Sequence, residues 1–273
     1  MPNNSSLTLR LPLLCSMRAI DDHQASYAAA IKENPDNAPF ARSDESTSPC
    51  EHAGNARLLV AFSKYWARGR TLRIEFLRNP PDVITQPIMD AANKWLPHVN
   101  LKFKMVTDGP SDIRIGLNEH LNWSEQGTDA LLIPQGMPTM EFNAQDLFGP
   151  GIKPLPELER IVLHEFGHML GAVHEHQHPE ANIPWNEPVL TALLKQVGYS
   201  DELIRKNFLD RYEGADFNHS PYDRDSIMHF DVPNLLTLGD FEVINTGKGL
   251  SPRDIQVMAA VYPDRSNSKF EKP

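Results

Sequence analysis

The chain has 273 residues and a formal net charge of −10 at pH 7, with 40% hydrophobic and 23% charged residues. This length holds one large domain or two small ones, and the composition is that of a globular protein. The acidic balance argues against a nucleic-acid partner, because there is no basic excess to replace counterions on phosphates. No apolar run reaches the roughly 20 residues that cross a bilayer, so we expect no membrane span.

Polar segments flank the predicted body. Residues 1–55 predict a leader that is disordered or propeptide-like, and residues 264–273 predict a flexible tail. The apolar stretch 7–17 is interrupted by polar residues and lacks a clear cleavage site, so there is no convincing secretory signal and the compartment stays open. Both cysteines, Cys15 and Cys50, lie in the leader, which excludes a disulfide framework for the body.

The body, residues 56–263, begins with strands and a helix. Alternating apolar and polar residues predict strands at 71–77, 101–106 and 112–117, with weaker patterns at 130–133 and 139–142. Apolar residues at helical spacing predict a helix over 82–96, with Asp82 as its N-cap and Pro87 as an irregularity. The strongest helical pattern spans 155–170 and stops at Gly171.

The second half of the body predicts loops with short helices. Helical patterns cover 187–196 and 201–209, and Ser251, followed by Pro252 and Asp254, opens a last helix that reaches Tyr262. Strands and a helix followed by loops with helices predict an α+β fold. We expect an N-terminal subdomain over 56–174 and a C-terminal subdomain over 175–263.

The chemistry concentrates in HEFGHMLGAVHEHQH, residues 164–178. His164 and His168 are four residues apart, so a helix projects both imidazoles from one face, where they can share a zinc ion. Gly171 permits the left-handed turn that ends the helix and brings His174 back as a third ligand. Three protein ligands with an open fourth position are typical of catalytic zinc, so one Zn²⁺ is the predicted cofactor. The alternative is a histidine-rich helix whose imidazoles serve packing alone.

Glu165 follows the first of these histidines and lies beside the ion rather than on it. Zinc lowers the pKa of a bound water towards about 7, and a carboxylate within hydrogen-bond reach completes its deprotonation. The same carboxyl group then passes the proton to a leaving amine. Glu165 is therefore the predicted catalytic base and acid.

The motif H-E-x-x-H-x-x-G-x-x-H is the zinc signature of the metzincin metallopeptidases. With Glu175 after the third histidine, it resembles the astacin-like members of that group. Residues 226–229, SIMH, are similar to the astacin-type Met-turn, and HEHQHPEANIPW, residues 174–185, is similar to microbial astacin-like proteins. Only these short segments of the body carry the resemblance specifically.

The resemblance implies a zincin-like fold: a twisted mixed sheet with a backing helix and an active-site helix, then a loop-rich C-terminal subdomain with a late helix. It implies that Met228 forms an apolar floor under the zinc. It also implies that a sheet edge between residues 122 and 142 holds an extended peptide. In the family, the residue at Glu175 often pairs with the mature N-terminal amine, and a loop-orienting role is the alternative. The family is usually secreted.

Several positions depart from the family pattern or stay open. Phe230 stands where many astacins have a tyrosine that helps to stabilise the tetrahedral intermediate, and Tyr222 is a candidate substitute. The family's catalytic-domain disulfides are absent. His176 and His178 are expected in a solvated loop and His229 in a structural role. A zinc switch by the Cys50 thiolate, or by a leader carboxylate such as Asp44, stays open.

These observations predict a monomeric zinc metalloendopeptidase that hydrolyses peptide or protein substrates. The first alternative is a catalytically weak or silent zinc-bound scaffold that binds peptides, and the second is a zinc hydrolase of non-peptide amides. The sequence assigns no substrate-binding residues and gives no cleavage specificity.

Overall fold

The computed structural model describes residues 15, 20–38, 63–149, 152–196, 198–212, 220–245 and 247–264. Its sheet has five strands in the order β2-β1-β3-β5-β4. The strands are β1 (Thr71–Phe76), β2 (Lys102–Met105), β3 (Ile113–Asn118), β4 (Trp123–Ser124) and β5 (Met140–Asn143). All neighbours pair in parallel except β4, which is antiparallel to β5 at the edge. The predicted α+β class is confirmed.

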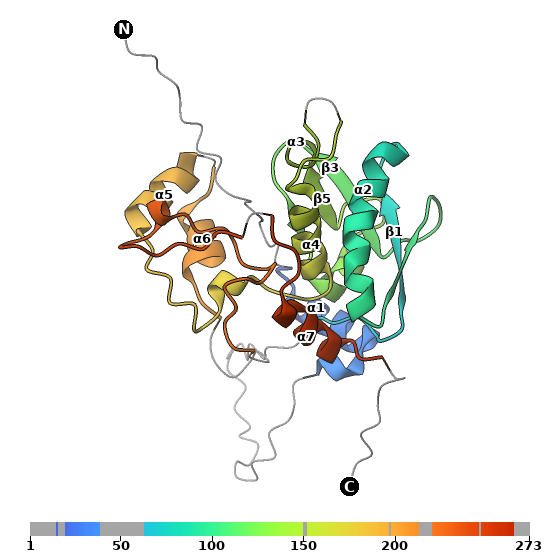
Figure 1. The fold of residues 1–273 in the computed structure, drawn as a ribbon. Coiled ribbons are helices and arrows are strands. Elements are labelled where there is room, and N and C mark those ends of the chain that lie inside the picture. The colour runs from blue at the N-terminus through green and yellow to red at the C-terminus, as the bar shows by residue number, and fades with distance from the viewer. Residues whose placement is uncertain are drawn as a thin grey trace, which may run out of the picture.

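Two long helices cover one face of this sheet. Helices α2 (Asp82–Ala92) and α4 (Leu158–Met169) lie side by side against it (Figure 1). The main core lies between them and the strands, where Leu72 and Ile74 of β1 pack in the same cluster as Ile88 and Phe166. Each such side chain contributes about 1.5–3 kcal/mol when it is fully buried. Helix α4, which carries the first two predicted zinc ligands, is therefore held by the largest apolar cluster.

The structure differs from the sequence expectations at four places in this half, one of which is the unpredicted short helix α3 (Ala144–Leu147). The predicted strand at 130–133 overlaps a 3₁₀ helix, η3 (Gly127–Leu132), because Asp129 turns inward to Lys64 at 2.6 Å. Strand β4 was not predicted, since two residues show no alternation. Helix α2 has Pro81 rather than Asp82 at its N-cap, runs through Pro87, and continues as the 3₁₀ helix η2 (Asn93–His98).

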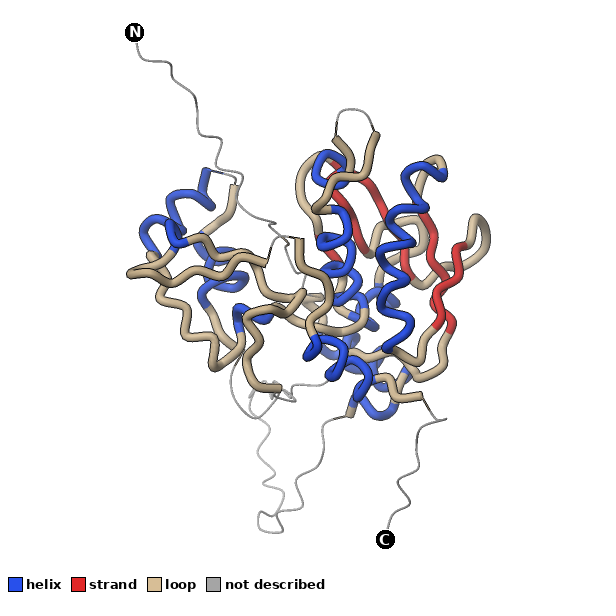
Figure 2. The backbone as a smooth tube through the Cα atoms, viewed as in Figure 1, coloured by secondary structure: helices blue, strands red, loops and turns tan. Residues whose placement is uncertain are grey.

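The C-terminal half consists of helices and loops in the part that the structure describes (Figure 2). Its elements are α5 (Glu187–Gln196), α6 (Asp201–Ile204), the π turn η5 (Arg205–Leu209), η7 (Asn234–Leu236) and α7 (Pro252–Val261). Two small apolar clusters, one around Leu194 and Phe230 and one around Ile183 and Val232, replace a continuous core. Helix α7 begins with the predicted capping box between Ser251 and Asp254.

Part of the predicted leader is ordered. Helix α1 (His23–Glu33) and the short η1 (Pro35–Asn37) lie near α7 (Figure 1). Residues 39–62, which include Asp44 and Cys50, lie outside the described residues, as do 265–273. The domain division at residue 55 stays a prediction. None of the helices that the structure describes is long and apolar enough to cross a membrane.

Candidate metal centre

Helix α4 carries His164 and His168 on its inner side. Both residues are almost completely buried, at 2% and 0% exposure. The Nε2 atoms of the two rings lie 3.2 Å apart, as expected for residues one helical turn apart. The helix thus brings two imidazole nitrogens to one point without help from a loop.

The turn after α4 delivers the third imidazole. Gly171 adopts a φ of +102°, the N–H of Gly171 donates to the carbonyl of His168, and the N–H of Ala172 donates to the carbonyl of Gly167. This pair of bonds is a Schellman motif, which reverses the chain at a left-handed residue. Nε2 of His174 then lies 3.0 Å from Nε2 of His168. The structure therefore brings the three predicted ligands together.

Hydrogen bonds orient two of the rings. Nδ1 of His164 lies 2.8 Å from the carbonyl oxygen of Ile227, and Nδ1 of His168 lies 3.0 Å from that of Ala172. Because a carbonyl only accepts, each Nδ1 carries the proton and each Nε2 keeps its lone pair for the centre. Burial lowers the pKa of His168 to about 4 and that of His164 well below its usual value, which keeps both imidazoles neutral.

This donor set fits a zinc ion. Two nitrogens at about 2.0–2.1 Å from one tetrahedral ion lie roughly 3.3 Å apart, close to the separations found between these rings. The ligand atoms of Cys15, His164, His168 and His174 all lie within 4.8 Å of one another. Neutral imidazoles and thiolates are donors that zinc prefers.

Glu165 lies beside these rings and is fully buried. Its Oε2 accepts a hydrogen bond from the thiol of Cys15 at 3.3 Å, whereas its Oε1 has no partner among the described residues. Burial raises the pKa of Glu165 to about 8. Burying a carboxylate oxygen without a hydrogen-bond partner destabilises the fold. Packing therefore gives no reason for the position of Oε1 of Glu165, which is a candidate group for the chemistry of this site.

The Met-turn lies under the centre. The backbone N–H of Ile227 and the hydroxyl of Ser226 donate to the carboxylate of Asp254 at 2.8 and 2.7 Å. This places the sulfur of Met228 against Gly167 of α4, where a Cβ atom would collide with it. Met228 therefore lies against the helix that bears the histidines, as the predicted apolar floor requires. The contacts that Asp254 makes to this turn were not predicted, although its capping motif was.

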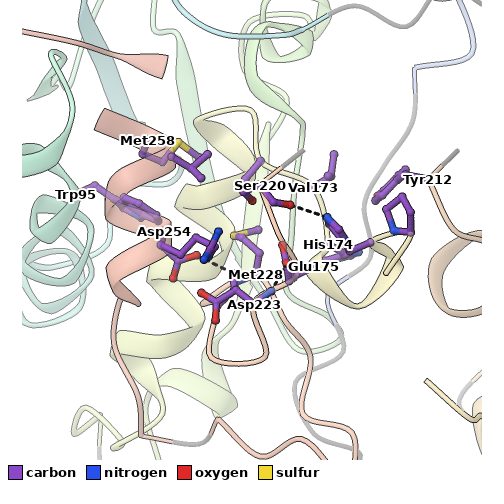
Figure 3. Close-up of a pocket in the computed structure, with 16 residues that line it drawn as sticks. Trp95, Val173, His174, Glu175, Tyr212, Ser220, Asp223, Met228, Asp254 and Met258 are labelled. Carbon is purple, nitrogen blue, oxygen red and sulfur yellow. Dashed lines mark hydrogen bonds between the residues drawn. The ribbon is translucent and has the colours of Figure 1, made fainter. Parts of the chain in front are cut away.

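A cavity of about 130 Å³ adjoins the centre. Figure 3 shows Trp95 and Met258 on one side of it and His174 and Tyr212 on the other. Glu175 also lines the cavity, and its Oε1 accepts the backbone N–H of Asp223 at 2.8 Å. That bond supports the loop-orienting role of Glu175. Pairing of Glu175 with an N-terminal amine stays a prediction.

Phe230 forms an apolar wall over the imidazoles. Its ring centre lies 4.4 Å from that of His174 and 4.3 Å from that of His176. His176 is buried rather than solvated, contrary to the expectation, because its Nε2–H donates to the carbonyl of Asn207 at 2.8 Å. His178 is half-buried, and its Nε2–H donates to the carbonyl of Ser220 at 2.9 Å.

The expected structural role of His229 stays a prediction, and its contacts are compatible with that role. His229 is fully buried, and its Nε2 pairs with the hydroxyl of Tyr222 at 2.7 Å. The phenol of Tyr222, considered as a substitute for the family tyrosine, is thus engaged with His229 in this structure.

The sequence reasoning missed Cys15. Its thiol lies among the imidazoles, and its backbone forms a parallel bridge with Asn122, next to the edge strand β4. The only sequence signal is an apolar context, LPLLC, at residues 11–15 of a polar leader, which is too short to indicate a site. Cys50, the cysteine considered for this role, lies outside the described residues.

Fold and site together define a zinc metallopeptidase. The family model described as Matrixin matches residues 66–188. Two structures of myroilysin are 33% identical and cover 74% of this chain; one has a TM-score of 0.67 over 96% of its own chain, the other 0.58 over 87%. High choriolytic enzyme 1, a hatching-enzyme zinc protease from the medaka fish Oryzias latipes, shares the fold at 18% identity and a TM-score of 0.50, over 74% of this chain and 96% of that chain.

None of the curated proteins matches the chain. The chain belongs to the metzincin zinc metallopeptidases, as its signature predicted, and its cofactor is one catalytic zinc ion.

Proposed function

We propose that this chain is an endopeptidase in which His164, His168 and His174 hold the zinc and Glu165 moves the proton. The observation that carries the proposal is the convergence of three neutral imidazoles beside a buried carboxylate with one unpartnered oxygen. Packing alone gives no reason to bury these groups together, because each loses hydration there.

Zinc, when bound, polarises the scissile carbonyl and makes an adjacent water more acidic. Oε1 of Glu165 is placed to accept the proton of the attacking water. The same carboxyl then gives that proton to the leaving amine, and its burial, which raises its pKa to about 8, favours the protonated form that does so. The rings of Phe230 and His176 exclude solvent from one side, which strengthens every charge interaction within the site.

The position of β4 at the edge of the sheet favours a peptide as the substrate. An edge strand offers unpaired backbone groups to an extended chain, and the bridge between Cys15 and Asn122 uses this edge within the molecule. The described form is accordingly latent: Cys15 pairs with Asn122 beside this edge, and its sulfur, once deprotonated, would take the fourth corner of the ligand set. A closed set of four ligands is typical of zinc that does not react.

The test uses the full-length chain with Cys15→Ser, so that the thiol does not compete. Adding Glu165→Gln should leave one zinc per chain, measured by elemental analysis, and should lower cleavage of a mixed peptide library by roughly 10²–10⁴-fold. Glu202→Gln, which changes an exposed carboxylate on α6, is the matched control and should cleave like the parent. Cleavage retained by Glu165→Gln contradicts the assignment of the base.

A silent peptide-binding scaffold is the second candidate, and Phe230 favours it, since a phenyl ring cannot donate a hydrogen bond to an oxyanion. The same library separates the two candidates. Cleavage that a chelator abolishes and zinc restores identifies the peptidase, whereas saturable binding without products identifies the scaffold. Turnover of simple amides in place of peptides identifies the third candidate, a hydrolase of non-peptide amides.

A further inference from the structure

The ordered part of the leader reaches the metal centre through one short segment of the body. Residues 64–66 precede β1, with α1 and η1 on one side and the turn after α4 on the other. This segment therefore joins the leader to the turn that delivers His174.

On the leader side, the side chain of Asn37 forms two hydrogen bonds with the backbone of Tyr65. Asn37 is 1% exposed; its side-chain amide donates to the carbonyl of Tyr65 at 2.8 Å, and its oxygen accepts the N–H of Tyr65 at 2.9 Å. The amide of Asn34 donates to the carbonyl of Trp66 at 3.3 Å. Two asparagines thus complete the backbone pairing of a segment that has no strand partner there.

On the opposite side, the same segment supports the end of α4. The indole N–H of Trp66 donates to the carbonyl of Met169 at 2.8 Å, and Trp66 is fully buried. The ring of Tyr65 lies against Gly171, close enough that a Cβ atom there would lie 2.7 Å from it. The last carbonyls of a helix need such outside donors, so Tyr65 and Trp66 fix where α4 stops.

The position of this stop sets the metal ligands. The turn at Gly171 leads to His174, and the carbonyl of Ala172 in the same turn accepts the Nδ1–H of His168. A shift of the turn would therefore misplace one ligand and remove the partner that orients another.

Further contacts show that α1 is built into the body. Ser26, at 1% exposure, donates to the fully buried carboxylate of Asp129 at 2.5 Å. Glu33 pairs with Arg70 at 2.5 Å and accepts the backbone N–H of Ala67 at 3.1 Å. Loss of α1 would leave this buried polar surface without its partners, which is unfavourable because buried polar groups need hydrogen bonds.

We infer that residues 22–37 are a permanent positioning element of the metal centre, so that a cut which frees the metal from Cys15 falls between Cys15 and Asp22. Cys15 and the resident helix α1 then have opposite roles, because the first closes the ligand set and the second shapes it. The inference rests on the proposed histidine ligands but not on peptide cleavage.

The test introduces Asn37→Ala into the full-length Cys15→Ser chain. Competition with a chromophoric chelator should show zinc bound at least tenfold more weakly, and the visible spectrum of the cobalt-substituted protein should change. In the metal-free protein, the amides of Gly171 and Ala172 should exchange hydrogen faster. If Asn37→Ala does not fold, Asn34→Ala removes a single contact to the body and should give a smaller change in the same direction.

The control is Ile183→Ala, which opens a cavity in a cluster remote from the leader and loses a comparable stability. It should keep zinc affinity within twofold of the parent. The inference fails if Asn37→Ala also stays within twofold, or if Ile183→Ala weakens zinc equally. It also fails if N-terminal sequencing of processed, zinc-loaded protein finds a start beyond Asn37. Zinc affinity is measured without substrate, so a silent enzyme leaves this result intact.

Discussion

The two halves of the molecule hold their parts of the metal centre in different ways. The N-terminal half packs α4 against a five-stranded sheet through one continuous core, so His164 and His168 follow from the placement of a whole helix. The C-terminal half has two small clusters of its own, and its contribution, Met228, reaches the main core from a turn that individual hydrogen bonds to Asp254 fix. Side chains placed by a packed helix tolerate many conservative changes in the core, whereas side chains placed by a hydrogen-bonded turn depend on a few polar groups.

This contrast predicts that the largest loss of folding stability follows the removal of one carboxylate in the loop-rich half. Asp254→Ala removes the acceptor of three buried donors, on Ser226, Ile227 and Ser251. We expect the free energy of unfolding, measured by urea titration, to fall by about 4 kcal/mol. Asp225→Ala, in an exposed pair with Lys248, should cost less than about 1 kcal/mol. Equal losses in the two variants would contradict the contrast.

The next largest effect is a dependence on pH. Burial lowers the pKa of His229 to about 4, below its value of about 6.5 in the unfolded chain. Between these values the unfolded state binds the extra proton, so stability falls as the pH drops from 6.5 to 4. For His229 alone the loss is about 3 kcal/mol. Urea titrations of chelator-treated His229→Gln across this range should show a shallower decline than the parent, and an unchanged slope would rule out this role.

The smallest effect tests the contact between the halves. Gly167→Ala should stabilise a helix by about 1 kcal/mol from propensity alone. Because the new Cβ collides with the sulfur of Met228, we expect a net loss of about 1 kcal/mol instead. In a Met228→Ala background the collision is gone and the gain should return. A double-mutant cycle with zero coupling would show that the halves do not touch here.

The same contrast explains how far the sequence could be read. Helix α4 and its histidines were predictable because the apolar residues and the two histidines both follow the helical repeat over a few neighbouring residues. The metzincin signature, the capping box at Ser251 and most strands follow similarly from local patterns. The 3₁₀ helix at 127–132 was missed because Asp129 is paired with Lys64, far away in sequence.

Cys15 and the burial of His176 were missed for the same reason. Cys15 lies 150 residues from Glu165, which it contacts, and His176 is buried through the carbonyl of Asn207. Long-range polar pairs of this kind leave no periodic trace, so the part of the site that depends on them becomes visible only in the fold.

The burial of Cys15 makes transient opening of the structure around it measurable. A thiol at 0% exposure, whose pKa burial raises further, reacts with a thiol-specific dye only in molecules whose leader has lifted away. In a chain carrying Cys50→Ser, the labelling rate divided by that of the unfolded chain gives the fraction of time spent uncovered. Under the proposed latency, that fraction sets an upper limit on the proteolysis by the uncut chain.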